Sequence, residues 1–380
     1  MTLRLCKFRI DGVALDPSGL GLVYAPGDYR EVTRVACKVT AANGLTGQYL
    51  GGDAAAYTQL RTVAPTLLGL EAWNREVAYT RAKGVLRQLD GAGYGVLDIA
   101  LWDLYGKAVG LPLAKLLGGG REVVPAYASS MAGDTSGGLD TPDKYARFAV
   151  ECQELGYHGF KLHLATGATV RQMADTVVAV REAVGPDMRV MVDPGGKLNT
   201  WLDAWTLGRV CDEQRVAWLE DPYGPQSVAT FGYRHLRERI ATPLLISEHV
   251  RGVEQHATAV LSGATDIVRV DVEQDGGVTG ALKIAHFAEA LGLDVEIHRA
   301  GPVQRHLLSA LRNSNYYEMG LVHPLTPATG LPGMVYADGY ADGLHAVDET
   351  GCVPVPRGPG LGVDYDEARL DAAATSEFTI

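Results

Sequence analysis

The sequence predicts an α/β protein built on a closed parallel (β/α) barrel, with a smaller α+β domain attached to it. Eight short apolar runs recur between Val123 and about Leu325, spaced roughly 20 to 36 residues apart, and helical patterns separate them. Strands that alternate with helices are typical of a parallel sheet, and eight such units favour a closed barrel of ~200–250 residues. The length of 380 residues leaves room for a second domain.

Residues 1–125 carry the pattern of the attached domain. The run Arg30–Val39 alternates and is rich in β-branched residues, and turns follow at Asn43-Gly44 and Gly51-Gly52. Apolar residues then recur at helical spacing over Gly95–Tyr105, and Gly110-Leu111-Pro112 ends that helix. Because strands precede helices here and do not alternate with them, we expect an α+β domain.

Residues 126–325 are expected to form the barrel domain. The alternative is an open doubly wound sheet, but no G-x-G-x-x-G follows the first strand and no G-x-x-x-x-G-K-[ST] occurs. Residues 326–380 are rich in Pro, Gly and Asp, and we expect them to pack back on the N-terminal domain. The predicted strands are Val124–Ala128, Phe160–Leu164, Arg189–Val192, Ala217–Leu219, Leu244–Ile246, Ile267–Val270, Val295–Ile297 and Tyr316–Met319.

Composition and charge exclude several classes of protein. The net charge is −11, from 34 basic and 45 acidic residues, and no Lys/Arg run exists, so we expect no nucleic-acid partner. No apolar run reaches 18 residues, which argues against a membrane span. The start MTLRLCKFRI lacks the apolar region of a signal peptide, and five scattered cysteines read as reduced thiols. We therefore expect a cytoplasmic protein.

Ionisable residues stand at the ends of the predicted strands. In a (β/α) barrel the active site lies at the carboxyl ends of the strands, so these side chains should meet in one cavity. A single strand-end acid is more often the N-cap of the next helix, but a whole series of them is different. The residues are Lys161, His163, Asp193, Glu220, Glu248, Asp271, His298 and Glu318.

Three of these acids follow successive strands. Asp193, Glu220 and Glu248 are 27 and 28 residues apart, and neighbouring strands lie ~4.8 Å from one another, so their carboxylates should converge. Unpaired, they would repel each other, whereas a hard divalent cation with carboxylate oxygen ligands relieves the repulsion. The spacing predicts an Mg²⁺ site. A metal-dependent hydrolase would have more histidine ligands.

The other strand-end residues suggest acid–base chemistry around that metal. Lys161 and His163 share one face of their strand, which we take as inward. Asp271 and His298 come from adjacent strands, so the carboxylate would orient the imidazole. Glu318 should face the metal across the cavity and, if protonated, donate a hydrogen bond to a substrate carboxylate. This set suits abstraction of a proton α to a carboxylate, with histidine as the base.

In these residues the chain resembles a known family, the mandelate racemase-like branch of the enolase superfamily (mandelate racemase/muconate lactonizing enzyme family). The resemblance covers essentially the whole chain. It rests on Gly95–Gly119, Lys161-Leu162-His163, Asp193, Glu220 within Leu-Glu-Asp-Pro, Glu248, Asp271 with the following Gly276-Gly277, His298 and Glu318. It implies a modified (β/α)7β barrel under an α+β capping domain that the C-terminal tail completes.

The resemblance also implies roles for these residues. Asp193, Glu220 and Glu248 match the three metal ligands, Asp271 and His298 match an Asp–His dyad, and Glu318 matches an electrophilic acid. Substrate selectivity would come from capping-domain loops, here within Ser18–Arg30 and Gly47–Asp53, with Tyr24 as a candidate contact. Ser129, at the end of the first barrel strand, is a second candidate for substrate binding.

Two departures from the family pattern concern the substrate. His163 stands where relatives often have a second lysine, so it is either a second base or a hydrogen-bonding group, with Lys161 then supplying positive charge. Asp193-Pro194-Gly195 replaces a frequent Asp-x-Asn, which keeps the metal ligand and loses the amide.

The resulting functional hypothesis is a hydro-lyase that dehydrates an aldonic or aldaric acid to a 2-keto-3-deoxy acid. The alternatives are a racemase or epimerase that uses His163 and His298 on opposite faces, a lactone cycloisomerase, and a non-catalytic barrel. We expect a small-molecule carboxylate as substrate, neither nucleic acid nor membrane as partner, and a homo-oligomer.

Overall fold

A computed structural model describes residues 1–15, 22–89, 91–165, 167–222, 230–326 and 335–380. Its larger sheet contains eight parallel strands that follow one another around a barrel in chain order, and β11 pairs with β4. A parallel bridge between Val295 and Ser314 joins β10 to the segment just before β11. The strands are β4 (Val123–Ser130), β5 (Gly159–His163), β6 (Arg189–Asp193), β7 (Leu219–Glu220), β8 (Leu244–Ile246), β9 (Ile267–Val270), β10 (Asp294–Ile297) and β11 (Tyr317–Val322).

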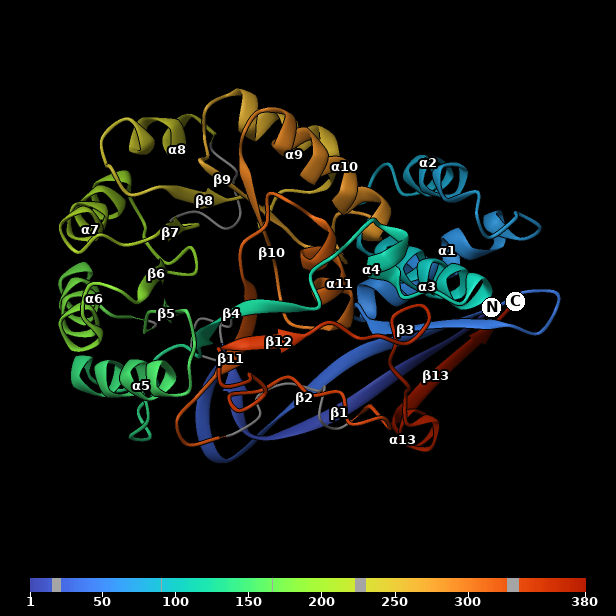
Figure 1. Cartoon of the computed structure of the whole chain (residues 1–380), viewed down its shortest axis with the longest axis horizontal. Helices are drawn as coiled ribbons and strands as arrows, with labels where there is room; N and C mark the ends of the chain where they lie inside the picture. Colours follow the sequence, from blue (N-terminus) through green and yellow to red (C-terminus); the bar gives the residue numbers. More distant parts are fainter. Residues whose placement is uncertain (16–21, 90, 166, 223–229, 327–334) are drawn as a thin grey trace.

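Seven helices connect these strands and form an arc around the barrel (Figure 1). Two of them, α6 and α7, begin with capping boxes at Thr169 and Thr200. The described residues thus form eight barrel strands with connecting helices and a separate antiparallel sheet, and the expected fold class is confirmed. The helices are α5 (Pro142–Glu154), α6 (Val170–Val184), α7 (Trp201–Glu213), α8 (Thr230–Arg237), α9 (Gly252–Leu261), α10 (Gly277–Ala290) and α11 (Pro302–Ala310).

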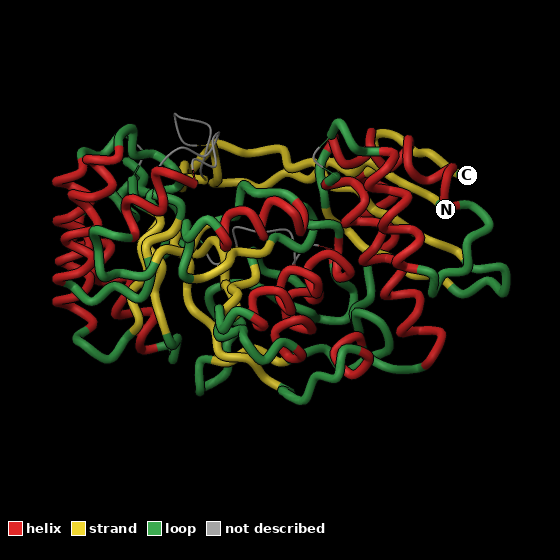
Figure 2. Tube along the Cα trace, turned by 90° about the horizontal axis from the view of Figure 1, so that it is seen from above, coloured by secondary structure: helices red, strands yellow, loops and turns green. Residues whose placement is uncertain are grey.

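A separate antiparallel sheet forms beside the barrel, with the strand order β13-β1-β2-β3. Its strands are β1 (Thr2–Leu15), β2 (Leu22–Thr40), β3 (Thr46–Gly51) and β13 (Ala374–Thr379). The chain termini meet at its edge, where the Met1 amino group lies 2.6 Å from the Ile380 carbonyl oxygen. Figure 2 shows the barrel and the cap side by side, with the two termini adjacent at the cap end.

Helices α1 (Ala54–Leu67), α2 (Arg75–Val85) and α3 (Ala92–Val109) complete the cap, and the short α4 (Leu113–Leu116) leads to β4. The C-terminal tail contacts both units. Its β12 (Cys352–Pro354) pairs with the barrel strand β4, and α13 (Glu367–Ala373) packs on β1 beside β13.

Helix α3 fixes the cap against the barrel. It is buried along most of its length and packs on both β3 and α10. Gly95 permits this contact, because a Cβ there would lie 1.9 Å from the Glu273 carbonyl oxygen in the loop after β9. The loop that carries active-site residues is therefore held directly by a capping-domain helix.

All five cysteines are free, and four of them are buried. Among the described residues, no helix combines the length and apolar character that crossing a membrane requires.

Candidate active site

A cavity of about 610 Å³ lies between the cap and the carboxyl ends of the barrel strands. Its volume is within the ~300–1,000 Å³ range of small-molecule sites. The cap contributes residues from β2, β3 and the turn after β3, including Leu50, Gly52 and Asp53. The predicted site residues that line it are His163, Asp193, Glu248, His298 and Glu318.

The structure brings Asp193, Glu220 and Glu248 together at the barrel end. One oxygen from each lies within 4.8 Å of the others. Burial raises the pKa of Glu220 despite the nearby Arg269 and Lys161. For Asp193 burial acts in the same direction, but the charges of His163 and Lys161 outweigh it and lower the pKa. Three converging carboxylates supply only hard oxygen donors, the set that Mg²⁺ prefers, so these residues fit the ion.

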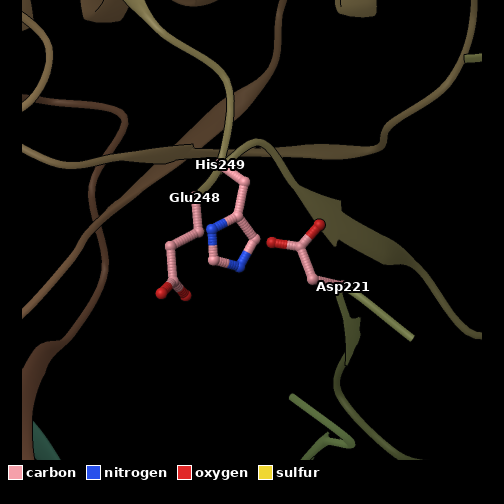
Figure 3. A group of neighbouring side chains, drawn as sticks. All are labelled: Asp221, Glu248 and His249. Carbon is pink, nitrogen blue, oxygen red and sulfur yellow. The ribbon is translucent and has the colours of Figure 1, made fainter. Parts of the chain in front are cut away.

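A second group of possible ligands shares Glu248 with the first. It consists of Asp221, Glu248 and His249, whose ligand atoms also lie within 4.8 Å of one another. Figure 3 shows the His249 ring between the two carboxylates in this view. Burial raises the pKa of Asp221 well above its usual value. Since an imidazole suits later transition metals better than Mg²⁺, the all-carboxylate group is the better magnesium site.

Lys161 lies beneath the carboxylates and does not line the cavity. Its side chain is 1% exposed, and its Nζ is 2.7 Å from Glu318 Oε1, 2.9 Å from Glu220 Oε2 and 3.5 Å from Asp193 Oδ2. Burial alone would lower the pKa of Lys161, but these carboxylates raise it well above its usual value. The ammonium group therefore compensates acids from three different strands.

Asp271 and His298 form the hydrogen-bonded pair that adjacency of their strands suggested. His298 Nδ1 lies 2.8 Å from Asp271 Oδ2, and His298 Nε2 lies 3.4 Å from Glu248 Oε1. Burial would lower the pKa of His298, but Glu248 and Asp271 outweigh it and raise the pKa. Asp271 is held in turn by the backbone amides of Glu273 and Gln274, so the imidazole has a fixed orientation toward the cavity.

His163 lies on the opposite side of the same cavity, and both nitrogens of its ring contact residues of the cavity wall. Nδ1 is 2.7 Å from the Ser130 carbonyl oxygen, and Nε2 is 3.0 Å from Asp193 Oδ2. Both nitrogens therefore face acceptor oxygens. Ser129 is fully buried behind the ring, with its Oγ 3.4 Å from Nδ1, and is not part of the cavity lining.

Arg269 is a central residue that strand-end reasoning missed. It is fully buried on β9, with Nε 3.0 Å from Glu220 Oε1 and Nη2 2.5 Å from Glu318 Oε2. Alternation contained the signal, because Arg269 precedes Asp271 by two residues and so shares its inward face. Burial would raise the pKa of Glu318, but Arg269 and Lys161 lower it well below its usual value. The charges of Arg269 and Lys161 therefore favour the ionised form of Glu318.

Tyr24 lies outside the cavity lining. Its ring stacks on His323, with a centroid separation of 4.6 Å, and His323 Nε2 is 2.8 Å from Asp134 Oδ2. The first predicted capping loop, Ser18–Arg30, lies partly outside the described residues, which leave out 16–21. Its residues Leu22 and Arg30 line the cavity, and so do several residues of the second loop within 49–53.

Several non-glycine residues beside the site have a left-handed backbone conformation, with positive φ. Asp221, Ser247 and Arg299 have φ values of 28°, 103° and 71°, and each is the direct neighbour of a strand-end residue. Non-glycine residues seldom adopt such angles, and they gather where a fold holds functional side chains in place. They flank Glu220, Glu248 and His298 respectively.

Comparison with known proteins places this arrangement in a family. The sequence model described as "Enolase C-terminal domain-like" matches residues 144–369, more than half of the chain. The "Mandelate racemase / muconate lactonizing enzyme, N-terminal domain" model matches residues 20–118. The chain belongs to the mandelate racemase/muconate lactonizing enzyme family of the enolase superfamily.

Several relatives within this family carry names of acid-sugar enzymes. The chain is 30% identical to L-talarate/galactarate dehydratase of Salmonella typhimurium, over 74% of this chain and 71% of that protein. It is 29% identical to a D-galactonate dehydratase family member of Streptomyces bingchenggensis, over 88% of each. The crystal structure of D-glucarate dehydratase from Agrobacterium tumefaciens, complexed with magnesium, superposes with a TM-score of 0.87 at 31% identity, over 99% of this chain and 98% of that one.

Proposed function

We propose that this chain is an Mg²⁺-dependent dehydratase that converts an aldonic or aldaric acid to a 2-keto-3-deoxy acid. One observation carries the proposal. A three-carboxylate group and an Asp–His pair share one closed-in cavity, with His298 Nε2 only 3.4 Å from Glu248. The dehydratases among the similar proteins, two of them at 30% and 31% identity, support the reaction class.

Asp193, Glu220 and Glu248 would hold the cation. When bound there, Mg²⁺ would supply the positive charge that stabilises the enolate form of the substrate carboxylate. The surrounding residues divide the remaining charge. Lys161 and Arg269 neutralise the buried acids from below, which leaves the cavity side of the carboxylates for the ion.

His298 is the proposed acid–base group at the reacting carbons. The C2–H bond breaks as His298 Nε2 takes the proton, the C3–O bond breaks, and the departing hydroxyl takes that proton from Nε2 to leave as water. The resulting enol then tautomerises to the 2-keto acid. Asp271 holds Nδ1–H at 2.8 Å, so Nε2 is the nitrogen that faces the substrate.

Four other predicted residues have more indirect roles in this proposal. Lys161 sets the charge of the metal group, and Ser129 supports the ring of His163. Arg269 and Lys161 hold Glu318 as an ionised group. A contact between Glu318 and the substrate would therefore require a proton or a bridging donor. Tyr24 has no direct role in this proposal, since its ring stacks on His323 outside the cavity lining.

A racemase or epimerase is the second candidate. The observation that favours it is that His163 and His298 come from β5 and β10, and both line the cavity. Two bases on opposite sides of one carbon are what inversion requires. The engagement of His163 Nε2 with Asp193 at 3.0 Å favours the one-base dehydratase instead.

Screening a panel of aldonic and aldaric acids for 2-keto products, with Mg²⁺ present, tests the proposal. A dehydratase gives a 2-keto-3-deoxy acid with one atom of solvent hydrogen at C3. Exchange of the C2 proton in D2O with inversion and without loss of water would replace the proposal by the epimerase. Absence of both product and exchange across the panel would contradict both.

A further inference from the structure

Two arginines of the cap face the active-site cavity. Arg30 and Arg34 lie on β2, and with Val32 between them they occupy alternate positions that all line the cavity. Both side chains are partly buried. The residues that the structure describes include no acid in an ion pair with either of them, and the Nη1 of Arg34 donates only to the carbonyl oxygen of Thr33, at 2.9 Å.

The nearest carboxylate is already committed to other donors. Glu273 accepts from Tyr49 Oη at 2.8 Å, from the Gly52 amide at 3.0 Å and from Arg299 Nη1 at 3.2 Å. Burial lowers the pKa of Arg34, and the charges of Arg299 and Arg30 act in the same direction against Glu273. A guanidinium that is partly removed from water and lacks a matched anion raises the free energy of the free enzyme.

The two walls of the cavity therefore differ in charge. The barrel wall contains the carboxylate group and the Asp–His pair together with Lys197 and Arg299, whereas the cap wall presents Arg30 and Arg34 beside Asp53. A substrate whose first carboxylate lies at the metal group directs its other end into this space. An aldonic acid ends in a neutral CH2OH group, whereas an aldaric acid ends in a second carboxylate, which a guanidinium binds with two parallel hydrogen bonds.

We propose that Arg30 and Arg34 form an anion subsite for the distal carboxylate of the substrate, and that the enzyme acts on aldaric acids in preference to aldonic acids. This inference rests on the proposed dehydratase function and narrows its substrate class. It assigns a binding role to β2 of the cap, opposite the strands that perform the chemistry.

The test compares substrates that differ only at the distal carbon. Wild-type kcat/KM is measured for galactarate against galactonate and for glucarate against gluconate, with 6-phosphogluconate as a distal anion of another kind. We expect the diacid to exceed the monoacid by about 100-fold or more in the configuration that is turned over, because a site built around a polar contact rejects a substrate that lacks it. A preference for the phosphorylated acid would overturn the assignment to a carboxylate.

Arginine variants show which residues produce the preference. Arg34→Gln and Arg30→Gln should each lower kcat/KM for the diacid by about 10- to 100-fold and change that for the monoacid by less than about threefold, whereas Arg34→Lys should retain part of the preference. The control is Arg9→Gln, an exposed arginine of the same sheet that pairs with Asp11 and does not line the cavity. Equal losses on both substrates would overturn the subsite.

Calorimetric binding separates this inference from the reaction itself. The His298→Asn protein with Mg²⁺, which lacks the proposed acid–base group, is titrated with galactarate and with galactonate, so the comparison does not depend on turnover. Tighter binding of the diacid supports the subsite even if no acid is dehydrated, a result that would contradict only the proposed reaction. Equal binding, or no binding of the diacid, would overturn the subsite even if a monoacid is dehydrated.

Discussion

Arg269 Nη2 lies 2.5 Å from Glu318 Oε2 inside the barrel, and neither side chain has more than 5% of its surface exposed. The same guanidinium is 3.0 Å from Glu220 Oε1 and donates to Tyr127 Oη at 3.2 Å. One buried cation on β9 thus links acids of β7 and β11, strands on different sides of the barrel. Together with Lys161 it compensates the buried charges of Glu220 and Glu318.

Removing this cation should destabilise the protein strongly. We expect Arg269→Met to lower the free energy of unfolding by about 3–5 kcal/mol, because it leaves Glu220 and Glu318 buried with Lys161 as their shared cation. Urea unfolding measures the change. Arg357→Met is the control, since Arg357 pairs with Glu122 on the surface, where loss of an ion pair costs less than about 1 kcal/mol. Equal effects of the two substitutions would contradict the structural role of Arg269.

His298 should be required for turnover and not for folding. We expect His298→Asn to lower kcat by about 100- to 10,000-fold, the usual contribution of a general acid or base. The free energy of unfolding should stay within about 1 kcal/mol of the wild-type value. Asp271→Asn should lower kcat in the same range because the ring loses the partner at 2.8 Å that fixes its tautomer. The exposed His286→Asn on α10 is the control. Full activity of His298→Asn on the identified substrate would contradict the proposed mechanism.

Mg²⁺ should stabilise the folded protein through its carboxylates. A ligand that binds only the folded state at 100 times its Kd adds about 2.7 kcal/mol, so the thermal midpoint of EDTA-treated protein should rise with added Mg²⁺. Glu248→Gln should reduce this rise and abolish activity, while Glu254→Gln, an exposed acid on α9, should preserve both. A rise of equal size in the Glu248 variant would place the cation elsewhere.

Local patterns were sufficient to predict part of the site and could not predict the rest. Asp193, Glu220 and Glu248 follow apolar runs, and parallel strands bring their carboxyl ends to one edge, so their convergence follows from period and spacing alone. Arg269 obeys the same alternation, but it stands inside an apolar run. A search limited to strand ends therefore does not include it.

The cap-facing residues have no such local signature. Arg30 and Arg34 alternate like any exposed strand residues, and only the packing of α3 on β3 and α10 turns their face toward the barrel. Likewise, the burial of Lys161 beneath three acids depends on the position of β5 relative to the strands that carry those acids. Both facts depend on contacts between residues that are distant in the sequence.

A buried acid on β10 should make stability depend on pH. Glu296 on β10 is 1% exposed, and burial raises its pKa from 4.5 to about 7 despite the hydrogen bond from Asn315 Nδ2 at 3.0 Å. Below pH 4.5 the carboxyl is protonated in both the folded and unfolded states and has no effect. Between pH 4.5 and 7 only the unfolded state ionises, so the free energy of unfolding falls as the pH rises.

We therefore expect Glu296→Gln to stabilise the protein in proportion to this loss. Glutamine resembles the protonated carboxyl, so the variant should match the wild type near pH 4.5 and exceed it by about 3 kcal/mol above pH 7, from about 2.5 pKa units at 1.36 kcal/mol each. Urea unfolding at pH 4.5, 5.5, 6.5 and 7.5 measures the difference. Asp98 and Asp275, whose pKa values burial raises to about 6, are present in both proteins and cancel. A difference that stays constant with pH, or matches that of the surface variant Glu349→Gln, would show that Glu296 is ionised in the folded protein.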